Sequence, residues 1–248
     1  MLPGAVVLRN GLHEPCDVRG GDLDDAGAVA PIELEIEPTT CVDVRLEISR
    51  WESHSDRFAV EALGTNARGA APGPEGRLAR LKAHFDVDPV LLLIGEAPGY
   101  QGCHYSGVAF TNEALLLKGS IPRMTLKGRI TSRLRPWCEP SATVVWGALH
   151  ANGLAERTVL WNAFAWHPHR ANQLHSNRTP TEEELRAGRD VLEAVVRRFR
   201  GARLIAVGKV AARTLTLLGY PPHEALRHPS MGGANEFRAG LAALARSL

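Results

Sequence analysis

A continuous apolar run at residues 89–94, followed by Gly95, is the feature that most constrains how this chain can fold. A run without polar positions is typical of a strand buried on both faces, as in a parallel sheet covered by helices. Strand and helix patterns alternate along the rest of the chain, with strands expected at residues 158–164, 203–207 and 224–227. The sequence therefore predicts an α/β fold, a three-layer α/β/α sandwich with a central, mainly parallel four-stranded sheet and right-handed crossovers.

Helical spacing and capping signals occupy the intervals between these strands. Leu78, Leu81 and Phe85 predict a helix over residues 75–85. Thr181 as an N-cap, followed by three glutamates that favour the positive end of a helix dipole, predicts a single helix to about residue 200. We also expect helices at residues 112–117, 143–154, 209–218 (closed by Gly219) and 235–246, with loop or irregular helix in the basic stretch 123–135.

The first 50 residues differ in charge from the rest of the chain. They hold ten acids and four arginines, a net charge of −6, so the remainder must carry +8 to give the total of +2. We predict an acidic N-terminal extension at residues 1–50, with an edge strand in the alternating stretch 32–37, and one main domain at residues 51–248.

The main domain carries a local excess of positive charge. Between Lys118 and Arg178 there are nine Lys or Arg residues and two acids, Glu139 and Glu156. Such an excess attracts a phosphate backbone, although a solvated basic face is the plain alternative. The candidates for phosphate contacts are Lys118, Arg123, Lys127, Arg129, Arg133, Arg135 and Arg170.

Several classes of protein are disfavoured. There is no apolar run of membrane-spanning length, and residues 1–4 lack the basic and apolar blocks of a secretory signal, so we expect a soluble intracellular protein. The four cysteines are far apart and form no CxxC pair, which predicts reduced thiols rather than disulfides or a zinc site. They are Cys16, Cys41, Cys103 and Cys138.

The unusual residues gather at the carboxyl ends of the expected strands, where ligands bind in open parallel sheets. The turn at residues 95–99 follows the first strand, Asn162 ends the second, Gly208 and Lys209 follow the third, and His228 follows the fourth. The turn matches neither phosphate-binding glycine pattern, and Pro98 removes an amide that a phosphate would need. The spacing thus predicts one cleft lined by four loops, without naming its reaction.

Three segments in order resemble the uracil-DNA glycosylase superfamily. GEAPGYQGCHYSGVAFT at residues 95–111 is similar to its first motif, which ends in a Phe that stacks on the extruded base, here Phe110. TVLWNAFAWHPHR at 158–170 resembles the uracil-reading strand, with Asn162 as the reader, and RHPSMGG at 227–233 resembles the second motif, with His228 and the wedge Met231. Two supporting stretches, at residues 178–185 and 206–219, resemble the iron-sulfur branch.

The resemblance implies a DNA glycosylase that hydrolyses the N-glycosidic bond of uracil in DNA and so starts base-excision repair, with the fold of that superfamily. The missing cysteines described below lead us to expect no cofactor. The resemblance also implies that His228 donates a hydrogen bond to uracil O2 and that Asn162 pairs with O4 and N3–H. Glu96 is the nearest carboxylate for the attacking water. The remaining expected pocket residues are Gly95, Ala97, Pro98, Gly99, Phe110, Ser230 and Met231.

Departures from the family pattern modify this expectation. The iron-sulfur branch has a cysteine just after the stretch matched at 178–185, where this chain has Ala187, Gly188 and Arg189, so we predict no cluster. Ala97 stands where the uracil-specific branch has a water-orienting Asp. Gly99 stands where that branch has a Tyr that excludes the thymine methyl, which predicts tolerance of 5-substituted pyrimidines, with Tyr100 as the nearby residue able to restore the block.

Two alternatives remain open at this point. One is a DNA-binding or damage-sensing member of the same superfamily that does not cleave, and the other is a hydrolase or transferase acting on small nucleotides. For the glycosylase we expect a monomer that binds single- or double-stranded DNA with a flipped base, is associated with no membrane or metal, and works in the cytoplasm at the bacterial nucleoid.

Overall fold

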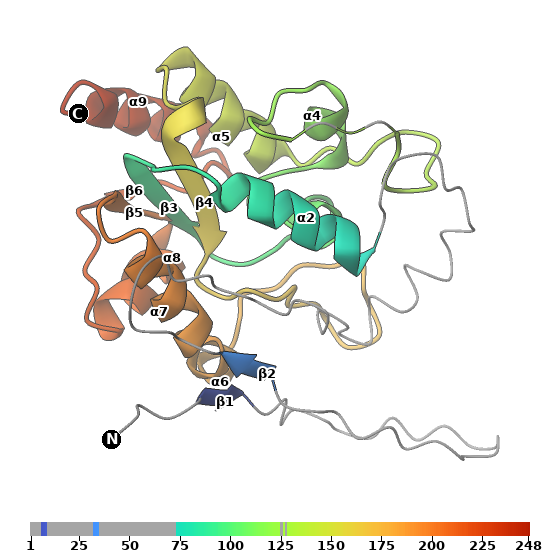
Figure 1. The fold of residues 1–248 in the computed structure, drawn as a ribbon, viewed down its shortest axis with the longest axis horizontal. Helices are drawn as coiled ribbons and strands as arrows, with labels where there is room; N and C mark the ends of the chain where they lie inside the picture. The colour runs from blue at the N-terminus through green and yellow to red at the C-terminus, as the bar shows by residue number, and fades with distance from the viewer. Residues whose placement is uncertain (1–5, 9–31, 35–72, 125, 127) are drawn as a thin grey trace. The chain divides into compact units, whose positions relative to one another are not determined.

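A computed structural model describes residues 6–8, 32–34, 73–124, 126 and 128–248 (Figure 1). The chain divides into two compact units, Met1–Arg50 and Trp51–Leu248. In the first unit, β1 (Val6–Leu8) pairs in antiparallel fashion with β2 (Ile32–Leu34), which occupies the start of the alternating stretch at residues 32–37. The rest of the predicted acidic extension lies outside the described residues, as do Cys16, Cys41 and Lys127.

The second unit is built on a sheet of four parallel strands in the order β4-β3-β5-β6. The strands are β3 (Leu91–Gly95), β4 (Thr158–Asn162), β5 (Arg203–Val207) and β6 (Glu224–Leu226). The apolar run forms β3, which is hydrogen-bonded on both sides and fully buried. The predicted fold class is therefore confirmed, and the register places Gly95 directly opposite Asn162.

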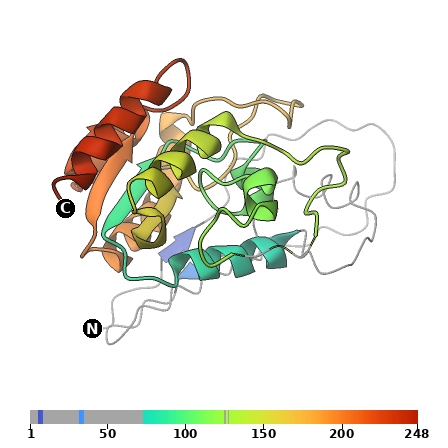
Figure 2. The ribbon, with the colours of Figure 1, turned by 90° about the horizontal axis from the view of Figure 1, so that it is seen from above.

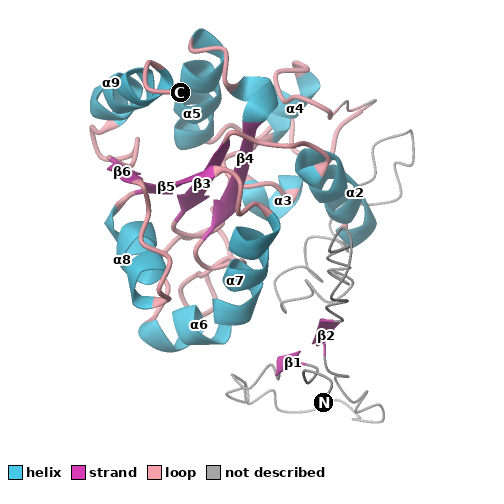
Figure 3. Cartoon of the chain, turned by 60° about the vertical axis from the view of Figure 1, so that its left-hand side comes forward, coloured by secondary structure: helices cyan, strands magenta, loops and turns pink. Residues whose placement is uncertain are grey.

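Helices cover both faces of this sheet. α5 (Pro140–Ala151) and α9 (Ala234–Ala245) lie on one face, while α7 (Arg189–Arg198) and α8 (Lys209–Leu217) lie on the other (Figures 2 and 3). α2 (Pro74–Phe85) precedes β3, and its buried His84 accepts a hydrogen bond at Nε2 from the Leu160 amide of the edge strand β4, at 2.8 Å. No helix in the described part of the second unit is both long and apolar enough to cross a membrane.

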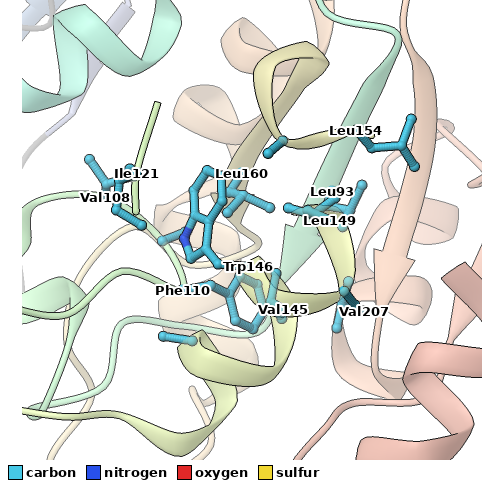
Figure 4. Close-up of a cluster of buried hydrophobic side chains, with 14 of the residues drawn as sticks. Leu93, Val108, Phe110, Ile121, Val145, Trp146, Leu149, Leu154, Leu160 and Val207 are labelled. Atoms are coloured by element: carbon cyan, nitrogen blue, oxygen red, sulfur yellow. The ribbon is translucent and has the colours of Figure 1, made fainter. Parts of the chain in front are cut away.

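The largest apolar cluster lies between the sheet and the α5–α9 layer (Figure 4). Leu91 and Leu93 of β3 point into it, so the alternation of a strand sends Leu92 and Ile94 to the opposite face. Trp146 of α5 is almost fully buried there, and its indole N–H donates to the Thr111 hydroxyl at 3.2 Å. Phe110 and Val145 lie beside Trp146 in the same cluster, so this core reaches the predicted site loop.

The prediction of a single helix from residue 181 to about 200 is wrong in one respect, because this segment forms two helices. α6 (Glu182–Ala187) and α7 are separated by Gly188, which packs closely against the rings of Phe164 and Trp166. Thr181 caps α6 as predicted, and Glu184 completes a capping box. Two short elements were not predicted, α3 (Cys103–Ser106) and the 3-10 turn Ala155–Arg157, and α5 begins three residues earlier than expected, at Pro140.

A buried carboxylate organises the connection between α4 (Glu113–Leu117) and α5. Asn112 caps α4, and the fully buried Glu113 accepts hydrogen bonds from the Ile130 and Thr131 amides and from the Trp137 amide. Burial disfavours the charged form, but hydrogen bonds from Arg129 and Thr131 outweigh it and lower the pKa of Glu113. Both ends of the segment at residues 130–137 are thus held by one side chain.

We predict that Glu113→Gln destabilises the protein by about 3 kcal/mol, because an amide supplies one acceptor oxygen and leaves buried donors and Arg129 without their partner. Urea unfolding at pH 7 measures the change. The carboxylate contribution is present above the unfolded-state pKa and is lost as pH falls through the lowered folded-state pKa. The difference between the two proteins should therefore shrink below about pH 4.

Glu156→Gln is the matched control for this substitution. Glu156 pairs with Arg123 at 3.3 Å, but its side chain is 74% exposed. An exposed pair contributes at most about 1 kcal/mol. Equal losses in the two variants would contradict the role assigned to Glu113.

Candidate active site

The carboxyl ends of β3 and β4 bring three of the predicted residues into contact. A Cβ atom added to Gly95 would lie 2.6 Å from the Phe110 ring and 2.7 Å from Oδ1 of Asn162. These separations are below van der Waals contact, so only glycine fits at this position. Asn162 is the last residue of β4 and is buried, with its amide beside the Phe110 ring.

Backbone-directed hydrogen bonds hold the loop between β3 and α4. The buried Ser106 hydroxyl bonds to the Val108 and Thr111 carbonyls, and the Val108 amide donates to the same hydroxyl. Arg80 of α2 donates from Nε to the Ser106 carbonyl at 2.6 Å. These contacts fix the path of the chain just before Phe110, whose backbone has the left-handed φ of 50° that side chains rarely adopt.

His228 follows β6 and joins the same group. Its ring centroid lies 5.9 Å from that of Phe110, and its Cβ lies against Gly208, the residue that follows β5. The Ser230 amide donates to Nδ1 at 3.1 Å, so in the neutral ring Nε2 carries the proton and is a donor. Burial, helped by the positive charge of Arg227, lowers the pKa of His228, which favours this neutral form.

Two further motif residues lie at the margin of this group. Ser230 bonds to His228 through both its amide and its hydroxyl, which orients the imidazole. Met231 is 90% exposed and has a left-handed φ of 51°, and Arg227 donates to its carbonyl. Met231 thus presents an exposed apolar side chain in the loop that follows His228, and the wedge role that the resemblance gives it stays a prediction.

The turn after β3 carries the expected carboxylate. Glu96 is partly exposed, its carbonyl accepts from the Phe164 amide, and its carboxylate bonds to none of the described residues. The neighbouring Ala97 and Pro98 offer no side-chain donor or acceptor. Glu96 is therefore the carboxylate of the 95–99 turn that is available to a water molecule.

Gly99 faces two polar side chains that the sequence analysis did not select. A Cβ atom added there would lie 3.5 Å from Nδ2 of Asn177 and 3.7 Å from Oε2 of Glu139, which is ordinary contact. Oε2 of Glu139 is buried and has no hydrogen-bond partner, and burial raises the pKa of Glu139 to about 7. The Tyr100 amide donates to Asn177, while its ring packs against Trp137 and His175.

Histidines form a second group beside this turn. His167 lies between His104 and His169, with ring centroids 5.3 and 5.5 Å away, and its Nε2 bonds to the Ser176 carbonyl. Burial, with a smaller effect of His167, lowers the pKa of His104 to about 3. Among the described residues, no group of three or more His, Cys, Asp or Glu side chains is arranged to hold a metal ion.

The structure separates the basic candidates into two kinds. Arg123 is tied to Glu156 and to the Ala83 carbonyl, and Arg129 is tied to Glu113, so both serve the fold. The Arg133, Arg135 and Arg170 side chains are exposed, and Lys118 is likewise on the surface. Arg178, which the resemblance placed in a supporting stretch, forms a two-point ion pair with Glu184 and donates to the His169 carbonyl.

Comparisons with known proteins identify the family of this chain. The family model described as the uracil DNA glycosylase superfamily matches residues 83–245. No curated protein matches the chain. The crystal structure of wild-type Pedobacter heparinus SMUG2 is similar, with a TM-score of 0.51 and 15% identity, over 78% of this chain and 97% of that chain. At this identity the likeness shows the shared fold, but the family model covers most of the chain, which therefore belongs to the uracil DNA glycosylase superfamily.

Proposed function

We propose that this protein hydrolyses the N-glycosidic bond of uracil, and of pyrimidines with a polar 5-substituent, in DNA, and so starts base-excision repair. Members of its superfamily are DNA glycosylases, which supports DNA as the substrate. The observation that carries the proposal is the meeting of Phe110 and Asn162 at Gly95, with the His228 ring beside that of Phe110. An aromatic face, an amide and an imidazole donor in one group match the chemistry of a flipped uracil.

Asn162 supplies the selection of the base. Its Oδ1 accepts from uracil N3–H while its Nδ2 donates to O4. Cytosine presents an unprotonated N3 and an amino group at these positions, so both partners would be left unpaired, at a cost of about 1 to 3 kcal/mol each. Oδ1 of Asn162 adjoins Gly95, as does the Phe110 ring, so the amide lies where the edge of a base stacked on Phe110 would meet it.

His228 stabilises the leaving group. Cleavage of the C1′–N1 bond sends its electron pair into the uracil ring and leaves positive charge on the sugar. The Nε2–H of neutral His228 donates to O2 of the uracil anion, and Ser230 keeps the ring in that tautomer. Water then forms the new C1′–O bond, and Glu96 accepts the proton that this water loses, which solvent returns to uracil.

Gly99 sets the width of the pocket at C5 of the base, because the residue at the corresponding position in the family faces that atom. The carboxyl of Glu139 and the amide of Asn177 lie at contact distance from a Cβ built on Gly99. A Glu139 pKa of about 7 leaves a large share of this carboxyl protonated near neutral pH, so that it both donates and accepts. A 5-hydroxymethyl group finds partners there, and the methyl of thymine does not.

Single-turnover cleavage of a uracil-containing duplex by excess protein tests the proposal. We expect His228→Ala to slow base release by about 100- to 1,000-fold, the usual effect of removing one preorganised donor. Asn162→Ala should lose discrimination between uracil and cytosine together with most of its rate.

His150→Ala is the matched histidine control, because His150 lies exposed on α5 and bonds to the Ser120 carbonyl. It should cleave like the unmodified protein. Tight binding of uracil-containing DNA without any base release would support a non-cleaving sensor instead. Absence of DNA binding would favour an enzyme acting on small nucleotides.

Gly99→Ala tests the pocket at C5. The added methyl contacts Asn177 and Glu139 without a clash, so the fold tolerates it while the room for a substituent shrinks. We expect cleavage of 5-hydroxymethyluracil to fall about tenfold more than cleavage of uracil, a difference of about 1.4 kcal/mol. Parallel assays on U:G, T:G and 5-hydroxymethyluracil duplexes measure this.

Gly147→Ala is the control for the added methyl, because Gly147 lies in α5 with open space around it. Its substrate ratio should match that of the unmodified protein. Strict uracil preference in the unmodified protein would refute the wider pocket.

A further inference from the structure

The connection between α4 and α5 contains an exposed five-residue loop, residues 132–136, which we call the Leu134 loop. In Figure 2 this connection extends away from the sheet. Leu134 is 96% exposed, the highest value among the exposed large apolar side chains of the described residues, and Arg133 and Arg135 beside it are exposed as well. One exposed leucine is ordinary on a protein surface, so the hydrogen bonds, stacked rings and charges around Leu134 must support any further role.

The loop is held rigid at its base. Glu113 accepts from the Ile130 and Thr131 amides before the loop and from the Trp137 amide after it. Arg129 adds a hydrogen bond to the Arg133 carbonyl at 2.8 Å. A segment already ordered in the free protein loses little conformational entropy on binding, so its contacts contribute more fully to affinity.

Stacked rings connect the loop to the active-site segment. The guanidinium of Arg133 lies 3.5 Å from the Trp137 ring centroid. Trp137 stacks on Tyr105, with centroids 5.8 Å apart, and meets Tyr100 edge-on at 5.5 Å. Both tyrosines belong to residues 95–111, so the Leu134 loop adjoins the segment that carries Glu96 and Phe110.

The charge of the loop identifies the kind of partner. Residues 118–138 contain six Lys or Arg and no acid. Arg123 and Arg129 are paired with Glu156 and Glu113, whereas Arg133 and Arg135 form no ion pair with a described carboxylate. An apolar side chain between two cations that have no carboxylate partner among the described residues is complementary to a nucleic acid, which offers both apolar base faces and phosphates.

We propose that the Leu134 loop is a DNA-contacting wedge additional to Met231. Leu134 packs against a base or sugar face that becomes accessible when the duplex opens, and Arg133 and Arg135 contact the phosphates on either side. The inference rests on the proposed function in that DNA is the substrate. It adds a specific surface, formed by the α4–α5 connection, that binds the DNA strand while the base is extruded.

The test measures DNA affinity and base unstacking with Leu134→Ala. The probe is a uracil-containing duplex with 2-aminopurine next to the uracil. Fluorescence anisotropy measures its binding, and the intensity of 2-aminopurine fluorescence measures base unstacking, both over a range of salt concentrations. We expect the affinity for this duplex to fall about five- to thirtyfold, because the substitution removes three carbon atoms that would be buried against the DNA. We also expect a smaller rise in 2-aminopurine fluorescence on binding. The salt dependence should stay the same, whereas Arg135→Gln should reduce the log–log salt slope by about one.

Leu217→Ala is the matched control. Leu217 is 68% exposed but lies at the last residue of α8, at the opposite end from Gly208 and His228. Because Leu134 is so exposed, its replacement leaves the fold intact, and unchanged unfolding by urea verifies this. The inference is overturned if Leu134→Ala and Leu217→Ala bind DNA equally well, or if Leu134→Ala changes only the oligomeric state in solution. Failure of the unmodified protein to bind any DNA would instead overturn the proposed function.

Discussion

The pairing of Gly95 with Asn162 is the constraint on which the rest of the site depends. Parallel register between β3 and β4 puts these residues opposite each other at the carboxyl edge of the sheet. The missing side chain of Gly95 admits both the Phe110 ring and the Asn162 amide at distances that any Cβ would forbid. A shift of one residue in this register would turn the Asn162 side chain to the opposite face of the sheet, and the site would lose the amide beside Phe110.

Buried polar side chains, together with apolar packing, hold the loops around this pair. Ser106 organises the segment before Phe110, and Glu113 ties the next connection at both of its ends. Loops carry unpaired backbone groups that helices and strands would satisfy internally, so a buried hydroxyl or carboxylate is an efficient way to fix them. Stacking between Trp137 and Tyr105 then places these two loops in contact with each other.

Local patterns predicted the framework well, for identifiable reasons. The apolar run became β3, and the capping signal at Thr181 marked the start of α6, because these signals depend on neighbours in sequence. The break at Gly188 was missed because it depends on the packing of Phe164 and Trp166 from another segment. Asn177 and Glu139 were missed for the same reason: they lie far along the chain from Gly99, and Glu139 was counted only as one of two acids in a basic stretch.

The sequence by itself determined the parallel sheet, the placing of the unusual residues at its carboxyl edge, and the family to which three ordered motifs belong. These properties depend on hydrophobic periodicity and on short motifs, whose residues are close together in the sequence. Only the tertiary structure decided which arginines serve the fold, that Ser230 fixes the tautomer of His228, and that a carboxyl and an amide border Gly99. Each of these features depends on the distance in space between groups that are far apart in the sequence. Burial, hydrogen bonding and charge interactions are determined by such distances.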